Sequence, residues 1–349
     1  SSFRAAAGTC LPLPRATRRP ARMPRQPKEP KDAPPPETDE ETLNENHLEF
    51  SDMARTVDGN GFAYRQVRCV SKKIGPIKAI AAYKHLLAID LSQNLIKDVA
   101  PLKGLSMLVL LNLADNAINT LKSWEPTEEE EPPFPHLVEL DLSGNSLAAL
   151  NPLPMKALKT LSFARNEITT CQDFAGHETL QVLDLSNQRT GKITSLAGVA
   201  NMPALTKLDV SGNELEDING LAELPALKSL SLGGNKFKAL EGPWQDFGGL
   251  VSLSLASCQF EAVQPLEVLR NLPLLRSLEV KGNPFCASLK GDTRTEVLIC
   301  HWRLTSIDGE SVTEAELEAA KQLNCQREEE RLGKKAEEEA AAAAAEEAG

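Results

Sequence analysis

The chain has 349 residues, of which 41% are apolar and only 4% aromatic, and its formal net charge is -11 at pH 7. Nucleic acid and anionic membrane surfaces both attract clustered Lys and Arg, so this charge argues against either as a partner. Another protein is the expected partner. Length alone permits two domains or one long repeat array, and an aliphatic composition favours a core built in layers.

The first 45 residues are expected to form a disordered N-terminal leader, because residues 23–45 are rich in Pro, Lys and acidic residues. Residues 1–22 contain five arginines and no acidic residue, a composition typical of an organellar targeting peptide. The alternative is a segment that precedes the natural start, since Met23 opens a more usual beginning, MPRQPKEPK. Both interpretations stay open at this point.

The cysteines and the hydropathy pattern indicate a compartment. Seven cysteines are scattered without a Cys-x-x-Cys pair, which favours a reducing environment over a disulfide framework. No apolar run approaches the roughly 18 to 20 residues needed to span a bilayer. We therefore expect a soluble intracellular protein.

One motif recurs through the middle of the chain, with the form L-x-x-L-x-L-x-x-N-x-L and conservative substitutions. Successive copies begin 21 to 29 residues apart. This spacing is that of the leucine-rich repeat. The nine copies begin at Leu86, Leu108, Leu137, Leu158, Leu180, Leu205, Leu227, Leu250 and Leu275.

The motif predicts its own local structure. In the copy LVELDLSGNSL, Leu137, Leu140 and Leu142 point inward, and a short strand around the last two pairs in parallel with its neighbours. One coil cannot bury that face alone, so stacked coils are required. The fold class predicted is α/β: a leucine-rich-repeat solenoid with a curved parallel sheet on the concave face, short helices or irregular coils on the convex face, and a C-terminal helix.

The asparagine of each copy is expected to form a structural ladder, because a buried carboxamide both donates and accepts hydrogen bonds. Cys258 replaces it with a weaker group. Gln188 lies in the unusual segment LSNQRTGKI, where we expect the ladder to bulge or break. The predicted ladder comprises Asn94, Asn116, Asn145, Asn166, Asn213, Asn235 and Asn283.

The repeats are expected over residues 86–285, after an N-terminal cap and irregular first coil over 46–85. In that cap, the DGNG segment from Asp58 to Gly61 resembles a calcium loop. Its twelfth position is Cys69 and not the Glu that such a loop requires, so a tight turn is preferred.

A C-terminal repeat cap is expected over residues 286–325. It contains an apolar helix around Val297 to Trp302, a turn at Gly309, and a capping box formed by Thr313 and Glu316. Residues 326–349 form a Glu- and Ala-rich tail that is helical or disordered. The sequence leaves open whether this tail is solvated or bound to a partner.

An acidic insertion, residues 122–135, lengthens one repeat. Its four consecutive glutamates, Glu128 to Glu131, cannot enter a core, so a protruding loop is predicted. Two interpretations stay open. The loop is a solvated insertion, or it is a docking point that presents exposed Trp124 and Phe134.

The concave face is the candidate partner-binding surface, as in other solenoids. The position between the two strand leucines is polar and half acidic, although the motif LDLS by itself accounts for many of these residues. Basic residues beside it predict a mixed charged strip that selects a charged partner. The candidate residues are Asp90, Asp141, Lys159, Arg165, Asp184, Lys207, Asp209, Lys228, Arg276 and Glu279.

The sequence lacks the motifs GxxxxGK[ST], HExxH and GxSxG, and its five histidines are far apart. We therefore expect no catalytic site, cofactor, metal or small-molecule substrate. The protein is not expected to be an enzyme.

The regular repeats and the cap sequence LTSIDGESVTEAE resemble the intracellular, SDS22-like leucine-rich-repeat group. A closer resemblance, over roughly residues 45–325, is to the ciliary leucine-rich repeat-containing protein 23 family. It rests on GNGFAYRQV, LSFARNEIT and LEVLRNLPLLRSLEVKGNP, while the acidic insertion and a more regular cap depart from that family.

This resemblance implies a structural subunit of the radial spoke in the axoneme of a motile cilium or flagellum, with spoke or other axonemal proteins as partners. The alternatives are a cytosolic adaptor that regulates a protein phosphatase, a protein that binds a dynein heavy chain, and a ribonucleoprotein subunit, which the negative charge disfavours.

Overall fold

A computed structural model describes residues 40–56, 61–126, 132–174, 176–221, 223–289 and 293–347, with side chains up to residue 335. The predicted leader as far as residue 39, most of the predicted DGNG turn and the glutamates at 128–131 lie outside the described residues.

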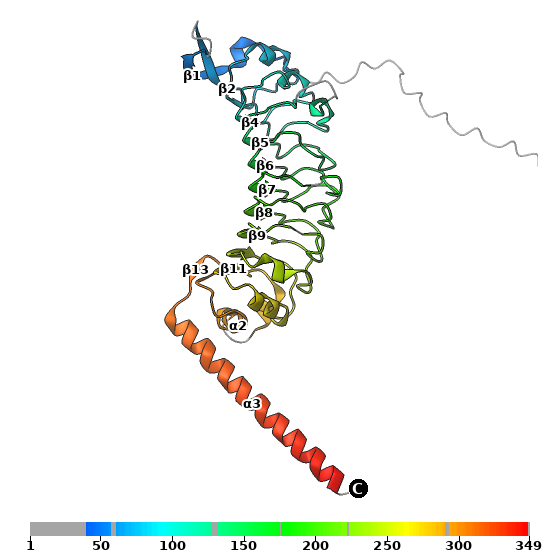
Figure 1. The fold of residues 1–349 in the computed structure, drawn as a ribbon, viewed down its shortest axis with the longest axis vertical. Helices are drawn as coiled ribbons and strands as arrows, with labels where there is room; N and C mark the ends of the chain where they lie inside the picture. Colours follow the sequence, from blue (N-terminus) through cyan, green and yellow to red (C-terminus); the bar gives the residue numbers. More distant parts are fainter. Residues whose placement is uncertain are drawn as a thin grey trace, which may run out of the picture. The chain divides into compact units, whose positions relative to one another are not determined.

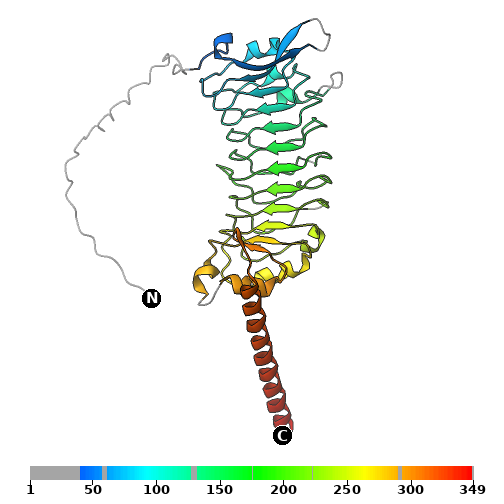
Figure 2. The same cartoon turned by 90° about the vertical axis from the view of Figure 1, so that its left-hand side faces the viewer.

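Within the described residues, thirteen strands form one sheet in chain order, and the coils return on the opposite side (Figures 1 and 2). Strands β2 to β12 pair in parallel, whereas β1 with β2 and β12 with β13 form antiparallel hairpins. The predicted solenoid class is confirmed. The strands are β1 Glu49–Arg55, β2 Phe62–Arg68, β3 Ala88–Asp90, β4 Leu110–Asn112, β5 Glu139–Asp141, β6 Thr160–Ser162, β7 Val182–Asp184, β8 Lys207–Asp209, β9 Ser229–Ser231, β10 Ser252–Ser254, β11 Ser277–Glu279, β12 Ser306–Ile307 and β13 Glu310–Ser311.

The core follows from the repeat. The middle residue of each three-residue strand is buried, as Leu140 is in β5, and its two neighbours point away from the core. Each fully buried leucine contributes roughly 1.5 to 3 kcal/mol before entropy is counted. The convex side carries the short 3-10 helices η2 Lys78–Ala82, η3 Ala100–Leu102, η4 Lys122–Trp124, η5 Trp244–Phe247 and η6 Gln264–Asn271.

The N-terminal cap begins earlier than the sequence predicted. Residues 40–45, assigned to the disordered leader, pack against the first coil instead. Glu41 donates its N–H to Lys73 O at 3.0 Å, and Leu43 is buried. The 3-10 helix η1, Glu45–His47, follows and leads into the hairpin of β1 and β2. Burial of Leu43 is the physical reason for the difference.

The C-terminal cap contains helices α1 Pro284–Ser288, α2 Thr293–Cys300 and α3 Glu314–Glu347. The predicted capping box is confirmed: Glu316 N–H donates to Thr313 Oγ1 at 3.3 Å, and Thr313 N–H donates to Glu316 Oε2 at 2.7 Å. Trp302, predicted within the apolar helix, lies beyond its end.

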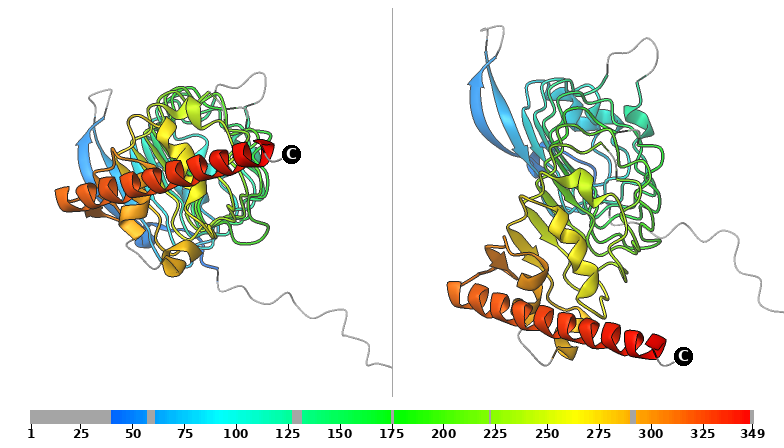
Figure 3. Two further views of the ribbon diagram at one scale, coloured as in Figure 1. Left: turned by 90° about the horizontal axis from the view of Figure 1, so that it is seen from below. Right: turned by 60° about the horizontal axis from the view of Figure 1, so that its bottom comes forward.

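Helix α3 crosses the predicted boundary between cap and tail at residue 325, so the two form one helix. Its first turns lie beside α2 (Figure 3), and Arg327 pairs with Glu296 of α2. This pairing shows that the start of the predicted tail packs against α2 of its own chain.

The acidic insertion is anchored by the two aromatic residues that we expected to be exposed. Trp124 is only 1% exposed and Phe134 is fully buried, with ring centroids 5.0 Å apart in a T-shaped arrangement. The Trp124 indole also donates to Val99 O at 3.1 Å. The docking role for these two side chains was wrong, because both rings complete the core on either side of the insertion.

Candidate protein-binding surface

The outward residues at the third position of each strand form a column along the sheet, here called the aspartate column. Strand pairing places each member opposite the next without a shift, so Asp90, Asp141, Asp184, Asp209 and Glu279 share one line. The complete column is Asp90, Asn112, Asp141, Ser162, Asp184, Asp209, Ser231, Ser254 and Glu279.

The aspartates of this column also hold the turns that follow their strands. Asp141 Oδ1 accepts from Ser143 N–H at 2.9 Å, and Asp184 and Asp209 make the same bond two residues ahead. One carboxylate oxygen of each is thus used locally, and the second makes no hydrogen bond or ion pair within the described part of the chain. The column is therefore both a structural feature of the repeat and an acidic surface.

The predicted basic residues do not form a single strip. Lys159, Lys228 and Arg276 each directly precede a strand, so they lie along the side of the sheet where the strands begin. Lys207, in contrast, is the first residue of β8. Arg165 lies past the other end of its strand, where it pairs with Asp115 at 3.2 Å. The expected strip is corrected on this point: its members belong to three different columns.

A hollow of about 550 Å³ lies at the N-terminal part of this face, over strands β2 to β6. The short side chain of Ala88 makes room for it between Gln66 and Leu110, which pair with Ala88 on the two neighbouring strands. The residues outside the predicted set that line the hollow include Ser51, Gln66, Arg68, Ala88, Leu110, Asn112 and Glu139.

Glu139 and Leu110 were not among the predicted residues, because of the first strand positions only the basic Lys207 was singled out from the sequence. The first position of each strand points outward too, as the alternation of a strand requires. Glu139 and Leu110 occupy that position in β5 and β4. The period-two pattern in VELDLS was a signal that could have identified Glu139.

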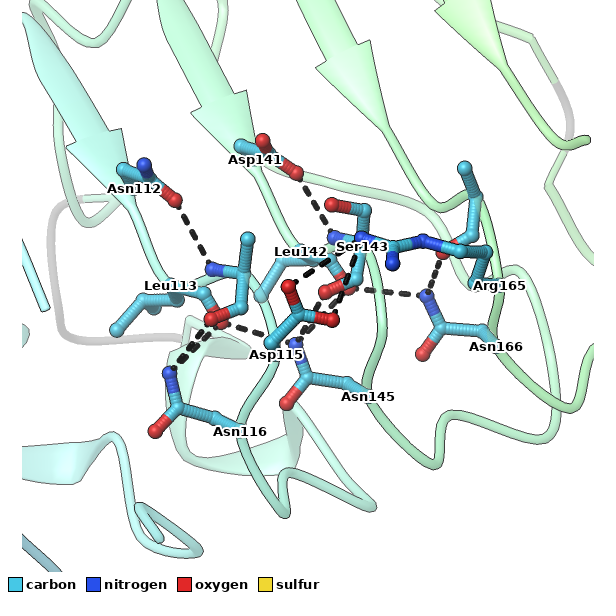
Figure 4. Close-up of polar contacts among 12 residues, drawn as sticks. Asn112, Leu113, Asp115, Asn116, Asp141, Leu142, Ser143, Asn145, Arg165 and Asn166 are labelled. Carbon is cyan, nitrogen blue, oxygen red and sulfur yellow. Dashed lines mark hydrogen bonds and ion pairs between the residues drawn. The ribbon is translucent and has the colours of Figure 1, made fainter. Parts of the chain in front are cut away.

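The asparagines lie behind this face and fix the turns. Asn145 donates to Leu142 O at 2.9 Å and to Leu113 O at 3.0 Å (Figure 4). Its Oδ1 accepts from Ile118 N–H at 3.0 Å. The bond to Leu142 O closes the turn within its own coil, and the bonds with Leu113 and Ile118 join that coil to the preceding one. The same pattern of bonds within and between coils recurs at Asn94, Asn116, Asn166, Asn213, Asn235 and Asn283.

The ladder continues through Gln188, where we expected a break. Its amide donates to Phe163 O at 3.0 Å and Leu185 O at 2.9 Å, and Ile168 N–H donates to its Oε1. The unusual residues after Gln188 are accommodated in the following loop, where Gly191 has φ of +67°. The prediction was wrong because a glutamine reaches the same three groups.

The buried cysteines and histidines occupy structural environments. Burial raises the pKa of the Cys171 thiol to about 12, and that of Cys258 to about 11, so both stay protonated at neutral pH. Burial also lowers the pKa of His177 and His301, and each ring contacts a backbone carbonyl, Met155 O at 3.1 Å and Leu272 O at 2.9 Å.

No group of three or more His, Cys, Asp or Glu side chains among the described residues is arranged to hold a metal ion. Within the same part of the chain, the helices are too short or too polar to cross a membrane.

Comparison with known proteins agrees with this architecture. The leucine rich repeat family model matches residues 178–237. Leucine-rich repeat-containing protein 23 from Bos taurus is 26% identical over 280 residues, which is 76% of this chain and 74% of the relative. The Homo sapiens protein of the same name is 27% identical with the same coverage.

Among solved structures, a TLR13–ssRNA13 complex contains a chain that matches with a TM-score of 0.50 and 22% identity, covering 70% of this chain and 38% of that one. This likeness shows the fold alone. The resemblance predicted from the sequence is confirmed. The chain is a leucine-rich-repeat protein related over most of its length to the leucine-rich repeat-containing protein 23 family.

Proposed function

We propose that this protein is a non-enzymatic structural and protein-interaction subunit of the ciliary or flagellar axoneme, and a radial-spoke component that contributes to motility. The observation that carries the proposal is the similarity to leucine-rich repeat-containing protein 23 over 76% of the chain. The segments GNGFAYRQV and LSFARNEIT, which carry the family resemblance, support the ciliary location.

The concave face is the proposed contact surface for other axonemal proteins. It presents the aspartate column together with Lys207. The cations at the start of strands β6, β9 and β11, which are Lys159, Lys228 and Arg276, flank this face. A surface with both signs of charge in fixed positions repels mismatched partners and accelerates the approach of a matched one. This arrangement suits a stable place in an ordered assembly.

The test is fractionation of the full tagged chain in cells with motile cilia. We expect it to remain with detergent-extracted axonemes and to be lost from axonemes that lack radial spokes. A chain found wholly in the detergent-soluble fraction contradicts the proposal. Co-purification of that fraction with a phosphatase catalytic subunit would favour the adaptor alternative instead.

A matched pair of variants tests the contact surface. Lys207→Glu reverses a charge on the concave face, whereas Lys238→Glu makes the same change at an exposed position outside it. We expect Lys207→Glu to weaken retention on axonemes and Lys238→Glu to leave it unchanged. Equal retention of both variants would contradict a charge-selective contact at Lys207.

A further inference from the structure

The hollow at the N-terminal part of the concave face combines an apolar floor with carboxylates that lack compensating cations. Leu110 is 40% exposed there, although leucines at the inward positions of the repeat are buried. Strand pairing sets Glu139 directly beside Leu110, and Asp141 beside Asn112. Since neighbouring strands are about 4.8 Å apart, one incoming side chain can contact Leu110 while another reaches both carboxylates.

The acidic residues that line the hollow outnumber its basic residues. Among the described residues that line it, Arg68 is the one cation, and it already pairs with Asp90 at 3.4 Å. The Glu139 carboxylate makes no hydrogen bond or ion pair within the described part of the chain, and Asp141 uses one oxygen for Ser143. Two carboxylates therefore face the opening beside an exposed leucine.

We propose that this hollow binds a segment of a partner protein in which a Lys or Arg stands next to an apolar side chain. The apolar side chain lies on Leu110, and the cation lies between Glu139 and Asp141. The inference rests on the proposed function and names the chemistry of its partner. Charge complementarity selects this occupant, because an acidic segment or a nucleic acid would place negative charge against the two carboxylates.

The direct test uses two synthetic peptides as probes, one alternating Lys with Leu and a matched one alternating Glu with Leu. Binding to the full-length protein is followed by fluorescence anisotropy. We expect the basic peptide to bind and the acidic peptide not to bind. Glu139→Lys should weaken binding of the basic peptide about tenfold, which corresponds to about 1.4 kcal/mol.

Two further variants separate a local site from general attraction to a negatively charged protein. Ala88→Leu fills the hollow without changing any charge and should also weaken binding about tenfold. Glu216→Lys makes the same charge change as Glu139→Lys at an exposed position outside the hollow, and should leave binding within about twofold. Equal binding of the basic peptide to all variants overturns the proposal. Unchanged thermal unfolding verifies that each variant is folded.

Failure of this inference is distinguishable from failure of the proposed function. If Glu139→Lys and Ala88→Leu remain on axonemes while Lys207→Glu is released, the proposed binding site in the hollow is contradicted. The proposed contact of the concave face at Lys207 is then supported. If the wild-type chain is wholly detergent-soluble but the peptides bind as expected, the axonemal role is contradicted. The hollow is then supported as a binding site for a basic and apolar segment.

Discussion

Arg165 reaches across one coil to pair with Asp115, its Nη2 3.2 Å from the aspartate Oδ1 (Figure 4). The coil between them contributes Gly144, whose φ is +69° and whose missing Cβ would lie 2.0 Å from that Oδ1. A glycine is thus required here for two reasons: the left-handed backbone and the close approach of Asp115. Arg165, which we predicted to bind a partner, is therefore engaged in an ion pair within its own chain.

Gly144→Ala is expected to lower the free energy of unfolding by about 1–3 kcal/mol, from backbone strain and displacement of Asp115. Arg165→Ala removes only an exposed ion pair and should cost less than about 1 kcal/mol. Denaturant unfolding followed by circular dichroism measures both. Gly248→Ala is the control, since no heavy atom lies within 4 Å of the added Cβ and its backbone is right-handed. A control as destabilised as Gly144→Ala would contradict the explanation.

Cys258→Asn is expected to stabilise the protein by about 1 kcal/mol. The thiol lies 3.2 Å from Leu232 O but offers no counterpart to the amide oxygen that accepts an N–H at the other ladder positions. Asparagine would supply that acceptor for the preceding coil, as Asn235 does for Leu215 N–H. A rise in the denaturant midpoint checks this prediction. A fall would show that the pocket is shaped for the thiol.

Trp124→Ala should destabilise the chain by about 3–5 kcal/mol, because it removes a buried indole, its ring contact with Phe134 and its bond to Val99 O. The expected effect is on stability and not on partner binding. Leu332→Ala, at an exposed position of α3, is the matched control and should be neutral. Full stability of Trp124→Ala combined with lost binding would restore the docking role that the structure contradicts.

Acidification should weaken the attachment of α3. The hydrogen bond from Arg294 and the N–H of Thr313 hold the pKa of Glu316 at about 2. An unfolded glutamate has a pKa of about 4.3. The folded pKa is the lower one, so this stabilisation is complete above pH about 4.3 and is lost as the pH falls towards 2. Thermal unfolding across this range should show a steeper loss for the wild type than for Glu316→Gln. Parallel curves for the two proteins would contradict the lowered pKa of Glu316 as the cause of the loss.

The placement of helix α3 and of the two aromatic residues that flank the insertion depended on long-range contacts. Burial of Trp124 and Phe134 requires the two sides of the insertion to meet, and the pairing of Arg327 with Glu296 requires α3 to lie beside α2. No local pattern carries that information. The position of Lys207 apart from Lys159 also became clear only from strand register.

The sequence by itself determined the stacked coils, the parallel sheet and the asparagine positions. Equivalent positions of adjacent coils contact one another in a solenoid, so a spacing of 21 to 29 residues specifies most contacts, including those of Asn145. Only the tertiary structure decided which polar residues are free to bind a partner. Arg165 is held by Asp115, whereas Glu139 stands unpaired beside Leu110 within the described residues. That difference arises because side chains reach across coils, where no fixed spacing in the sequence governs which groups meet.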